Sequence, residues 1–337
     1  MAKFHKGKQS IIFDNPPVIT NWASIAGKKE SEGPLGHLYD VVSKDNLFGQ
    51  ASWEKAEKHM QQVAIRTLAN KSKMTANAFQ VVFSGDLLNQ CIGSTFPLRN
   101  TGIPHIGLYG ACSTMAEALL AASLAVGGSF MDNAVAMTSS HFASSERQYR
   151  FPLGYGGQRT PTSQWTVTGA GAVLLQSEGT GPYITGCTIG TVTDKGITDA
   201  NNMGAAMAPA ALNTIKAHFE DVGSDSDDYD LIVTGDLGQL GKDILLTLAN
   251  REGLNLGGKL ADCGTLVFDL QKQDVHSGGS GCGCSAITLC SYLLNQLKTG
   301  QLKKILFCGT GALLSPTSTQ QGMPIPGICH AISISGE

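Results

Sequence analysis

The sequence is poor in charged and aromatic side chains. Charged residues make up 15% of its 337 residues and aromatic residues 7%, against roughly 25% charged residues in an average soluble domain. Lysine and arginine number 24 against 27 acidic residues, so the net charge is −3. Without an excess of positive charge, the chain is not expected to bind nucleic acid.

Long apolar stretches are also missing. The longest apolar run, 118–126, is about half of the roughly 18 residues that indicate a transmembrane helix. The first ten residues, MAKFHKGKQS, lack the apolar core of a signal peptide. We therefore expect a chain that has no membrane span and is kept inside the cell.

The nine cysteines include no CxxC pair, and the closest two, Cys282 and Cys284, are separated by one residue. This spacing does not favour a structural zinc site. An odd number of cysteines in apolar or glycine-rich surroundings is typical of reduced thiols that act as small buried side chains. We expect neither a metal site nor a cofactor.

An internal repeat is the strongest positive signal. The segments FQVVFSGDL (79–87) and YDLIVTGDL (229–237) read almost alike, and each follows a predicted amphipathic helix, at 53–70 and at 205–220. Two further pairs match in the same order: GACSTMAEAL with GCSAITLCSYLL, and NAVAMTSS with ILFCGTGA. The repeat predicts two βαβαβ halves, residues 1–178 and 179–337, packed as one α/β core.

The repeated apolar runs indicate where a ligand would bind. Val81–Phe83 and Leu231–Val233 are continuous apolar runs, as in parallel strands buried on both faces. Open α/β sheets bind ligands beyond the carboxyl ends of such strands. Candidate residues are therefore those that directly follow the apolar runs.

Cys112 is the first of these candidates. A strand predicted at 106–109 leads through Gly110-Ala111 into a helix predicted at 112–126. At a helix N-terminus, backbone N–H groups and the helix dipole would lower the thiol pKa and form an anion or oxyanion site. The alternative is a small residue that fills a tight junction between strand and helix.

The elbow at Cys112, the matching GCGCSA of the second half and the glycine-rich TGAGAVLL (168–175) resemble the thiolase family, which includes the ketoacyl carrier-protein synthases. The resemblance implies a five-layered αβαβα fold and places Cys112 at the nucleophile position. Two other family positions differ, because Gly235 and Ser280 stand where the condensing enzymes have histidine or asparagine. A thiolate without such a partner is poorly equipped for acyl condensation, so we expect no catalytic residues.

A second resemblance covers most of the chain. It is carried by these segments: IIFDNPPVI, EGPLGHLYD, GDLLNQ, GACSTMAEA, TSSHFASSERQYRFP, GYGGQ, GITDANNMGAAMAPAA, GGSGCGCSA and GTGALLSPTSTQQ. They are similar to those of the stage V sporulation protein AD family. The resemblance implies a protein of spore-forming bacteria that binds dipicolinic acid, free or as its calcium chelate. It further implies a role in moving this molecule into the developing spore, together with membrane subunits of the same transport system.

The ligand is a planar ring with two carboxylates, and the residues expected to contact it are Cys112, His141, Asp194, Asp86, Asn89, Ser280, Cys284 and Arg150. Helix N-termini at Cys112 and Cys284 would suit carboxylates, and the Arg150 guanidinium offers a fork for them. His141 has the alternative of a satisfied loop histidine. Asp86 and Asn89 have the alternative of a turn and helix cap.

Two other functions remain open at this point. The first alternative to a binding protein is a thiolase-like acyltransferase that uses Cys112. The second is a structural subunit with a vestigial pocket. The resemblance further implies a homodimer with Thr138 near its two-fold axis. It also implies peripheral attachment to the cytoplasmic face of a membrane in the forming spore.

Overall fold

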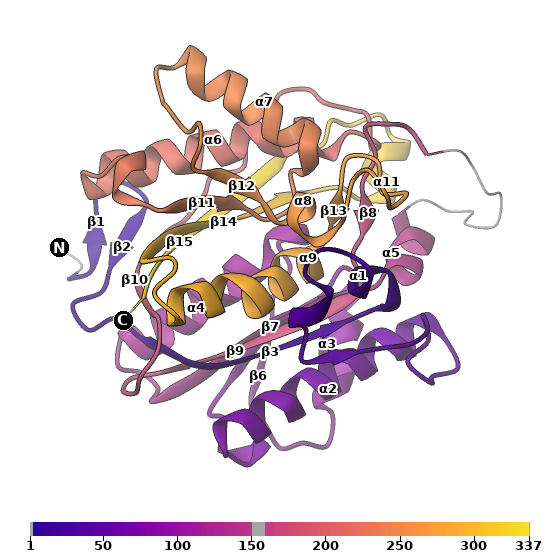
Figure 1. Ribbon diagram of the computed structural model, residues 1–337, viewed down its shortest axis with the longest axis vertical. Helices are drawn as coiled ribbons and strands as arrows, with labels where there is room; N and C mark the ends of the chain where they lie inside the picture. The colour runs from indigo at the N-terminus through magenta and orange to yellow at the C-terminus, as the bar shows by residue number, and fades with distance from the viewer. Residues whose placement is uncertain (1–2, 150–158, 337) are drawn as a thin grey trace.

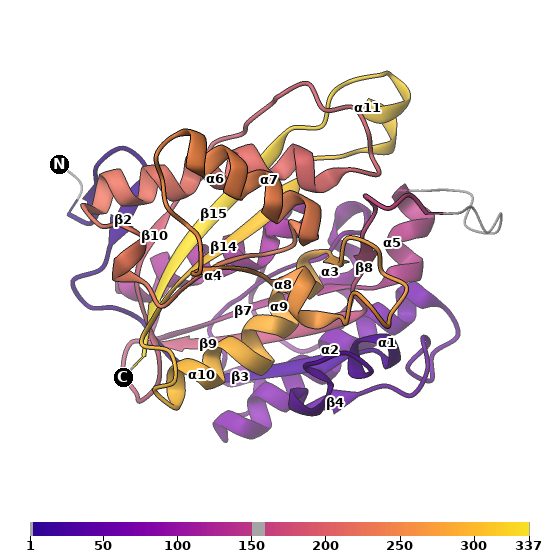
Figure 2. The ribbon, with the colours of Figure 1, turned by 45° about the horizontal axis from the view of Figure 1, so that its top comes forward.

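The computed structural model describes residues 3–149 and 159–336. They form five layers, in which helices and sheets alternate (Figure 1). The two sheets lie on either side of a central helical layer, and further helices cover their outer faces, as the turned view in Figure 2 also shows. This is the αβαβα architecture predicted from the sequence.

The pairing of Tyr183 with Val18 joins the two sheets into one hydrogen-bonded path, and both sheets have the same strand order. The first runs β3 (Val18–Ala26), β9 (Gly169–Gln176), β7 (Asn133–Ser140), β5 (Val82–Gly85) and β6 (His105–Gly107). The second runs β10 (Tyr183–Thr188), β15 (Gly327–Ser335), β14 (Lys304–Ala312), β11 (Leu231–Thr234) and β12 (Leu260–Asp262). If the five strands of each sheet are numbered by their order along the chain, both sheets have the spatial order first, fifth, fourth, second and third.

The direction of each strand pair also repeats. β5 is parallel to β6 and β7, and β7 and β3 are antiparallel to β9. β11 is parallel to β12 and β14, and β14 and β10 are antiparallel to β15. The predicted duplication is thereby confirmed. β9 ends at Gln176 and β10 begins at Tyr183, so the predicted division after residue 178 lies between these two strands.

The central layer contains α4 (Thr114–Gly127), α9 (Cys282–Thr288), a π-helical turn at Leu289–Leu293 and α10 (Leu294–Lys298). α4 contacts strands of both sheets and also α9. Glycines let β14 approach it closely, because a Cβ at Gly309 would lie 2.5 Å from that of Ala116. The layer is consequently apolar on nearly all sides.

Outer helices complete the layers. α2 (Trp53–Ser72) and α3 (Ile92–Leu98) cover the first sheet, and α6 (Met203–Val222) and α7 (Gly238–Arg251) cover the second. α2 buries Met60, Ala64 and Leu68, spaced by four residues, on the face that packs against the sheet. Ser52 caps its first turn by accepting a hydrogen bond from the backbone of Lys55. The predicted helices 53–70 and 205–220 thus exist with nearly the expected bounds.

The remaining elements are short. The helices are α1 (Lys28–Ser31), α5 (Phe142–Tyr149), α8 (Cys263–Val267) and α11 (Pro316–Gln320). The strands are β1 (His5–Lys6), β2 (Ser10–Ile12), β4 (Val41–Val42), β8 (Trp165–Thr166) and β13 (Gly279–Ser280). β8 and β13 pair with each other as a small separate sheet, which brings residues from both halves together.

Two local expectations need correction. The strand predicted at 106–109 is β6, which spans His105–Gly107, and Ala111–Ser113 form a 3-10 turn before α4. Thr138, which was expected near a two-fold axis at an exposed sheet edge, lies inside the sheet, because β7 is paired on one side with β5 and on the other with β9. The open edge of the first sheet is β6. Among residues 3–149 and 159–336, no helix is long and apolar enough to cross a bilayer.

Candidate functional site

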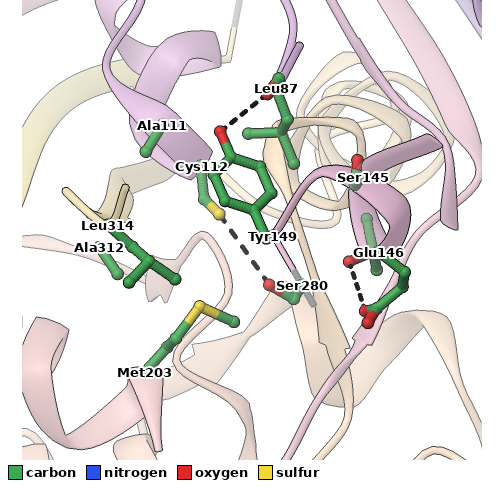
Figure 3. A pocket seen from close by; sticks show the side chains of 11 residues that line it. Leu87, Ala111, Cys112, Ser145, Glu146, Tyr149, Met203, Ser280, Ala312 and Leu314 are labelled. Carbon is green, nitrogen blue, oxygen red and sulfur yellow. Dashed lines mark hydrogen bonds between the residues drawn. The ribbon is translucent and has the colours of Figure 1, made fainter. Parts of the chain in front are cut away.

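Cys112 lies on a sharp turn between β6 and α4. Ala111, just before it, has a φ of 51°, a left-handed conformation that is uncommon for residues other than glycine. The turn directs the thiol toward the second half, where the Cys112 Sγ atom lies 3.9 Å from the Ser280 hydroxyl oxygen (Figure 3). Cys112 is 6% exposed. The predicted elbow is therefore present, but its thiol is largely withdrawn from water.

The predicted low pKa of this thiol is wrong. Burial, followed by the charge and hydrogen bonding of Asp236, raises the pKa of Cys112 well above its usual range. A carboxylate beside a buried thiol disfavours the thiolate more strongly than the start of the helix can favour it. Cys112 is consequently a neutral hydrogen-bonding group at neutral pH.

A pocket of about 450 Å³, counted to its mouth, opens beside Cys112. Its walls come from both halves, as Figure 3 shows, and its lining residues are Leu87, Ala111, Cys112, Ser145, Glu146, Tyr149, Thr166, Met203, Ser280, Ala312 and Leu314. Aliphatic side chains thus face a group of hydroxyl, thiol and carboxyl groups.

Behind the pocket lies the carboxylate of Asp236. It accepts hydrogen bonds from the Ser280 hydroxyl at 3.2 Å, the Gly281 backbone at 2.9 Å and the Thr310 hydroxyl at 2.9 Å. Asp236 has no exposed surface, and burial raises its pKa to about 6. A buried carboxylate behind the lining thus positions Ser280.

This carboxylate changes the expected anion site at the start of α9. The Gly281 N–H donates to Asp236, the Gly283 N–H donates to the Ser140 hydroxyl at 3.1 Å, and the Cys284 N–H donates to the Gly281 carbonyl. Cys284 is fully buried and is not part of the pocket lining. The expectation that a helix N-terminus at Cys284 faces the ligand is therefore corrected.

Helix α5 supplies one wall of the pocket. The Tyr149 hydroxyl donates to the Leu87 carbonyl at 2.8 Å and is hydrogen-bonded to the Tyr109 hydroxyl. Glu146 accepts a hydrogen bond of 3.4 Å from the Thr166 hydroxyl. These contacts connect the wall to both the β5 turn and the small sheet of β8 and β13.

Asp86 and Asn89 do not reach this pocket. Asp86 is buried, and accepts hydrogen bonds from the Ser94 hydroxyl at 2.6 Å and the Leu88 backbone at 2.8 Å. Asn89 is exposed, and its backbone donates to the Gln148 side chain. The Asp86 contact with Leu88 corresponds to the alternative of a turn, whereas the Asn89 contact is made by its backbone and is not a cap.

His141 and Asp194 also lie elsewhere. The Nε2 atom of His141 is 2.7 Å from the Asn46 carbonyl, and its Nδ1 accepts from the Ala143 backbone. The ring borders a separate hollow of about 350 Å³. Asp194 is exposed and caps a turn at Gly196. The structure therefore brings together only Cys112 and Ser280 of the predicted set, and Arg150 is outside the described residues.

Several lining residues were absent from that set, notably Glu146, Tyr149, Met203 and Leu314. Glu146 and Tyr149 share one face of a helix that follows β7, and their spacing of three residues was a usable signal. Asp236 had a signal too, because it occupies the same repeat position as Asp86. Among the described residues, no group of three His, Cys, Asp or Glu side chains is arranged to hold a metal ion.

The geometry agrees with the likeness to known folds. Over 95% of its length the chain resembles 3-oxoacyl-[acyl-carrier-protein] synthase III from Aquifex aeolicus VF5, of which 99% is covered, with a TM-score of 0.57 and 11% identity. A variant of OleA from Xanthomonas campestris matches 96% of this chain and 99% of its own, with a TM-score of 0.59 and 13% identity. At such identities these matches show the fold alone, which is thiolase-like.

Sequence similarity is more specific. The family model described as stage V sporulation protein AD matches residues 7–335. The stage V sporulation protein AD of Bacillus subtilis (strain 168) is 43% identical over 326 residues, which cover 97% of this chain and 96% of that protein. The chain therefore belongs to the stage V sporulation protein AD family.

Proposed function

We propose that this protein binds dipicolinic acid, free or as the calcium chelate, without chemical turnover, and takes part in its uptake into the developing spore. The observation that carries the proposal is a retained pocket whose cysteine is held neutral. The Asp236 carboxylate raises the pKa of this cysteine, and none of the 11 lining residues is a histidine. A site of this kind is suited to binding rather than to nucleophilic attack.

The lining suits a flat aromatic acid. Leu87, Met203 and Leu314 supply apolar surface for the faces of a ring (Figure 3). Ser145 lines the same pocket, and its buried hydroxyl has no hydrogen-bond partner among the described residues, so it can donate to a carboxylate oxygen. A few polar groups in a mainly apolar pocket commonly determine the orientation of a small ligand.

The test is a calorimetric titration with dipicolinate, with and without calcium. We expect a binding heat that saturates at one ligand per chain. Benzene-1,3-dicarboxylate serves as a matched acid without the ring nitrogen. Absence of saturable binding in both titrations would overturn the proposal.

Acyl transfer through Cys112 is the second candidate, because the elbow keeps the family position of the nucleophile. Asp236 works against it by raising the pKa of the thiol. We expect no release of coenzyme A above background from acyl-coenzyme A donors. Turnover that disappears in a Cys112→Ser variant would support the enzyme instead.

We further propose that the protein is a homodimer joined along β6. This strand pairs only with β5 among the described strands, and Ile106 and Tyr109 beside its open edge are 48% and 46% exposed. An edge strand with exposed apolar side chains requires a cover, which a second copy can provide. A monomer that persists on concentration in light scattering would contradict this assembly.

Membrane attachment is proposed to be peripheral, through membrane subunits of the same transport system, on the cytoplasmic face in the forming spore. The structured part of the chain described above offers no helix for insertion. Flotation with liposomes that contain these subunits is expected, and equal flotation with protein-free anionic liposomes would argue against the proposal.

A further inference from the structure

An anion bound in the pocket would lie close enough to Asp236 to affect the charge of its carboxyl group. Its carboxylate is fully buried directly behind Ser280, which lines the pocket. The partners of the carboxylate are two hydroxyl groups, one backbone N–H and the Cys112 thiol, all of them neutral. No ion pair involves Asp236 within the described parts of the chain.

The ionisable groups around Asp236 are acidic or neutral. Asp262, on β12, also acts on it and is itself a buried carboxyl group that accepts from Thr234 and two backbone N–H groups. The remaining groups are the thiols of the surrounding elements and the pocket-lining side chains of α5: Cys112, Cys263, Cys282, Cys284, Glu146 and Tyr149. Burial raises the pKa of each of these four thiols well above the usual range, so they stay protonated.

A dicarboxylate that touches Ser280 lies one side chain away from Asp236. Like charges at such a separation favour the protonated form of the weaker acid. Asp236 already has a pKa raised to about 6, so roughly nine in ten molecules carry its charge at pH 7. If the bound ligand raises the pKa of Asp236 further, to above about 7, most molecules take up a proton at this carboxyl group at pH 7.

We propose that a dicarboxylate enters this pocket together with a proton, and that Asp236 is the group that takes up the proton. The proposal rests on the binding function described above. It explains how a pocket with a buried carboxylate directly behind Ser280 can accept a dianion. It also makes Asp236 a positioning residue, because the protonated carboxyl can still hold Ser280 through a hydrogen bond.

The test is calorimetry at pH 7 with disodium dipicolinate and a chelator that removes calcium. The titration is run in phosphate, which has a small heat of ionisation, and in Tris, which has a large one. The difference in binding heat between the buffers gives the number of protons exchanged. We expect an uptake of roughly half to one proton per ligand, and none in Asp236→Asn. The matched control, Asp243→Asn on the exposed surface of α7, should behave as the wild type.

The pH dependence gives a second readout. When one proton is taken up, affinity weakens up to about tenfold from pH 7 to pH 8, whereas Asp236→Asn should show a flat profile. Equal heats in the two buffers for the wild type would overturn the proton uptake while leaving the binding function intact. Buffer-dependent heat that persists in Asp236→Asn would assign the proton to another group. Absence of binding in the wild type would overturn the binding function itself.

Discussion

The two halves of the molecule share a strand order and a Gly-Asp turn, yet their aspartates have different surroundings. Asp86 in the first half binds within its own half, to Ser94 and the Leu88 backbone. Asp236 in the second half instead holds Ser280 and Gly281 beneath the cysteine of the first half. The comparison shows that one duplicated turn now supports the fold in one copy and the pocket in the other.

The two elbows differ in the same way. In the first half a 3-10 turn with Ala111 in a left-handed conformation presents Cys112 to the pocket. In the second half Gly281, with a φ of 100°, leads directly into α9, and Cys284 is fully buried. The two elbows are therefore structurally different, although the strand order around them is the same.

The largest expected effect comes from filling the pocket between the two halves. Leu314→Trp places a bulky ring among the lining residues and should weaken dipicolinate binding at least about 100-fold, which corresponds to roughly 3 kcal/mol. Calorimetry measures the loss. The matched control is Met323→Trp, at a residue that is 52% exposed and outside the lining, and unchanged affinity in both variants would place the ligand elsewhere.

The next largest effect is expected on the stability of the fold, through the buried acidic pair Glu57 and Asp86 of the first half. Glu57 is buried near Asp86, and burial together with the Asp86 charge raises its pKa to about 8. The folded state therefore holds a proton that the unfolded chain releases above its ordinary pKa near 4.5, so the free energy of unfolding falls as pH rises from about 4.5 to 8. Glu57→Gln should remove this fall and be more stable than the wild type by at least about 2 kcal/mol at pH 8.

Denaturant unfolding between pH 5 and 8 checks this result. Glu178→Gln, at an exposed position, serves as the control and should follow the wild-type profile. A Glu57→Gln profile parallel to that of the wild type would show that Glu57 titrates normally.

The two elbow cysteines should respond differently to truncation. Cys112→Ala removes a hydrogen-bonding group from the pocket wall and should weaken binding by roughly 1 kcal/mol, about fivefold. Cys284→Ala should leave binding within twofold while lowering the free energy of unfolding by about 1 kcal/mol through a small cavity. Calorimetry and denaturant unfolding separate the two effects, and equal losses of affinity would contradict the asymmetry.

The smallest expected effect is at His141. Its ring is hydrogen-bonded to the Asn46 carbonyl and to the Ala143 backbone in α5, and it does not line the pocket. His141→Ala should therefore change the dissociation constant for dipicolinate less than twofold. A loss as large as that of Cys112→Ala would support the contact expected from the sequence and require a rearranged pocket.

Much of the fold could be predicted because each repeated strand and the helix before it are short, continuous segments of the sequence. The segments 79–87 and 229–237 contain β5 and β11, and the helices that precede them begin within two residues of the predicted starts. The pocket was harder to predict, because α5, β8 and the start of α6 meet only in the folded chain. The pKa of Cys112 depends on burial and on Asp236, neither of which is evident from the residues beside it. The Gly-Asp turn likewise reads the same in both halves, although only one of them reaches Ser280.

The most direct test of the central claim is protection of Cys112 from alkylation. Cys91 is half-buried, lies outside the pocket lining and provides a reference within the same molecule. With saturating dipicolinate, the rate of iodoacetamide modification at Cys112, followed by peptide mass, should fall at least about tenfold, while the rate at Cys91 stays the same. An unchanged rate at Cys112 under conditions where calorimetry shows saturation would contradict the assignment of the first-half elbow as the ligand site.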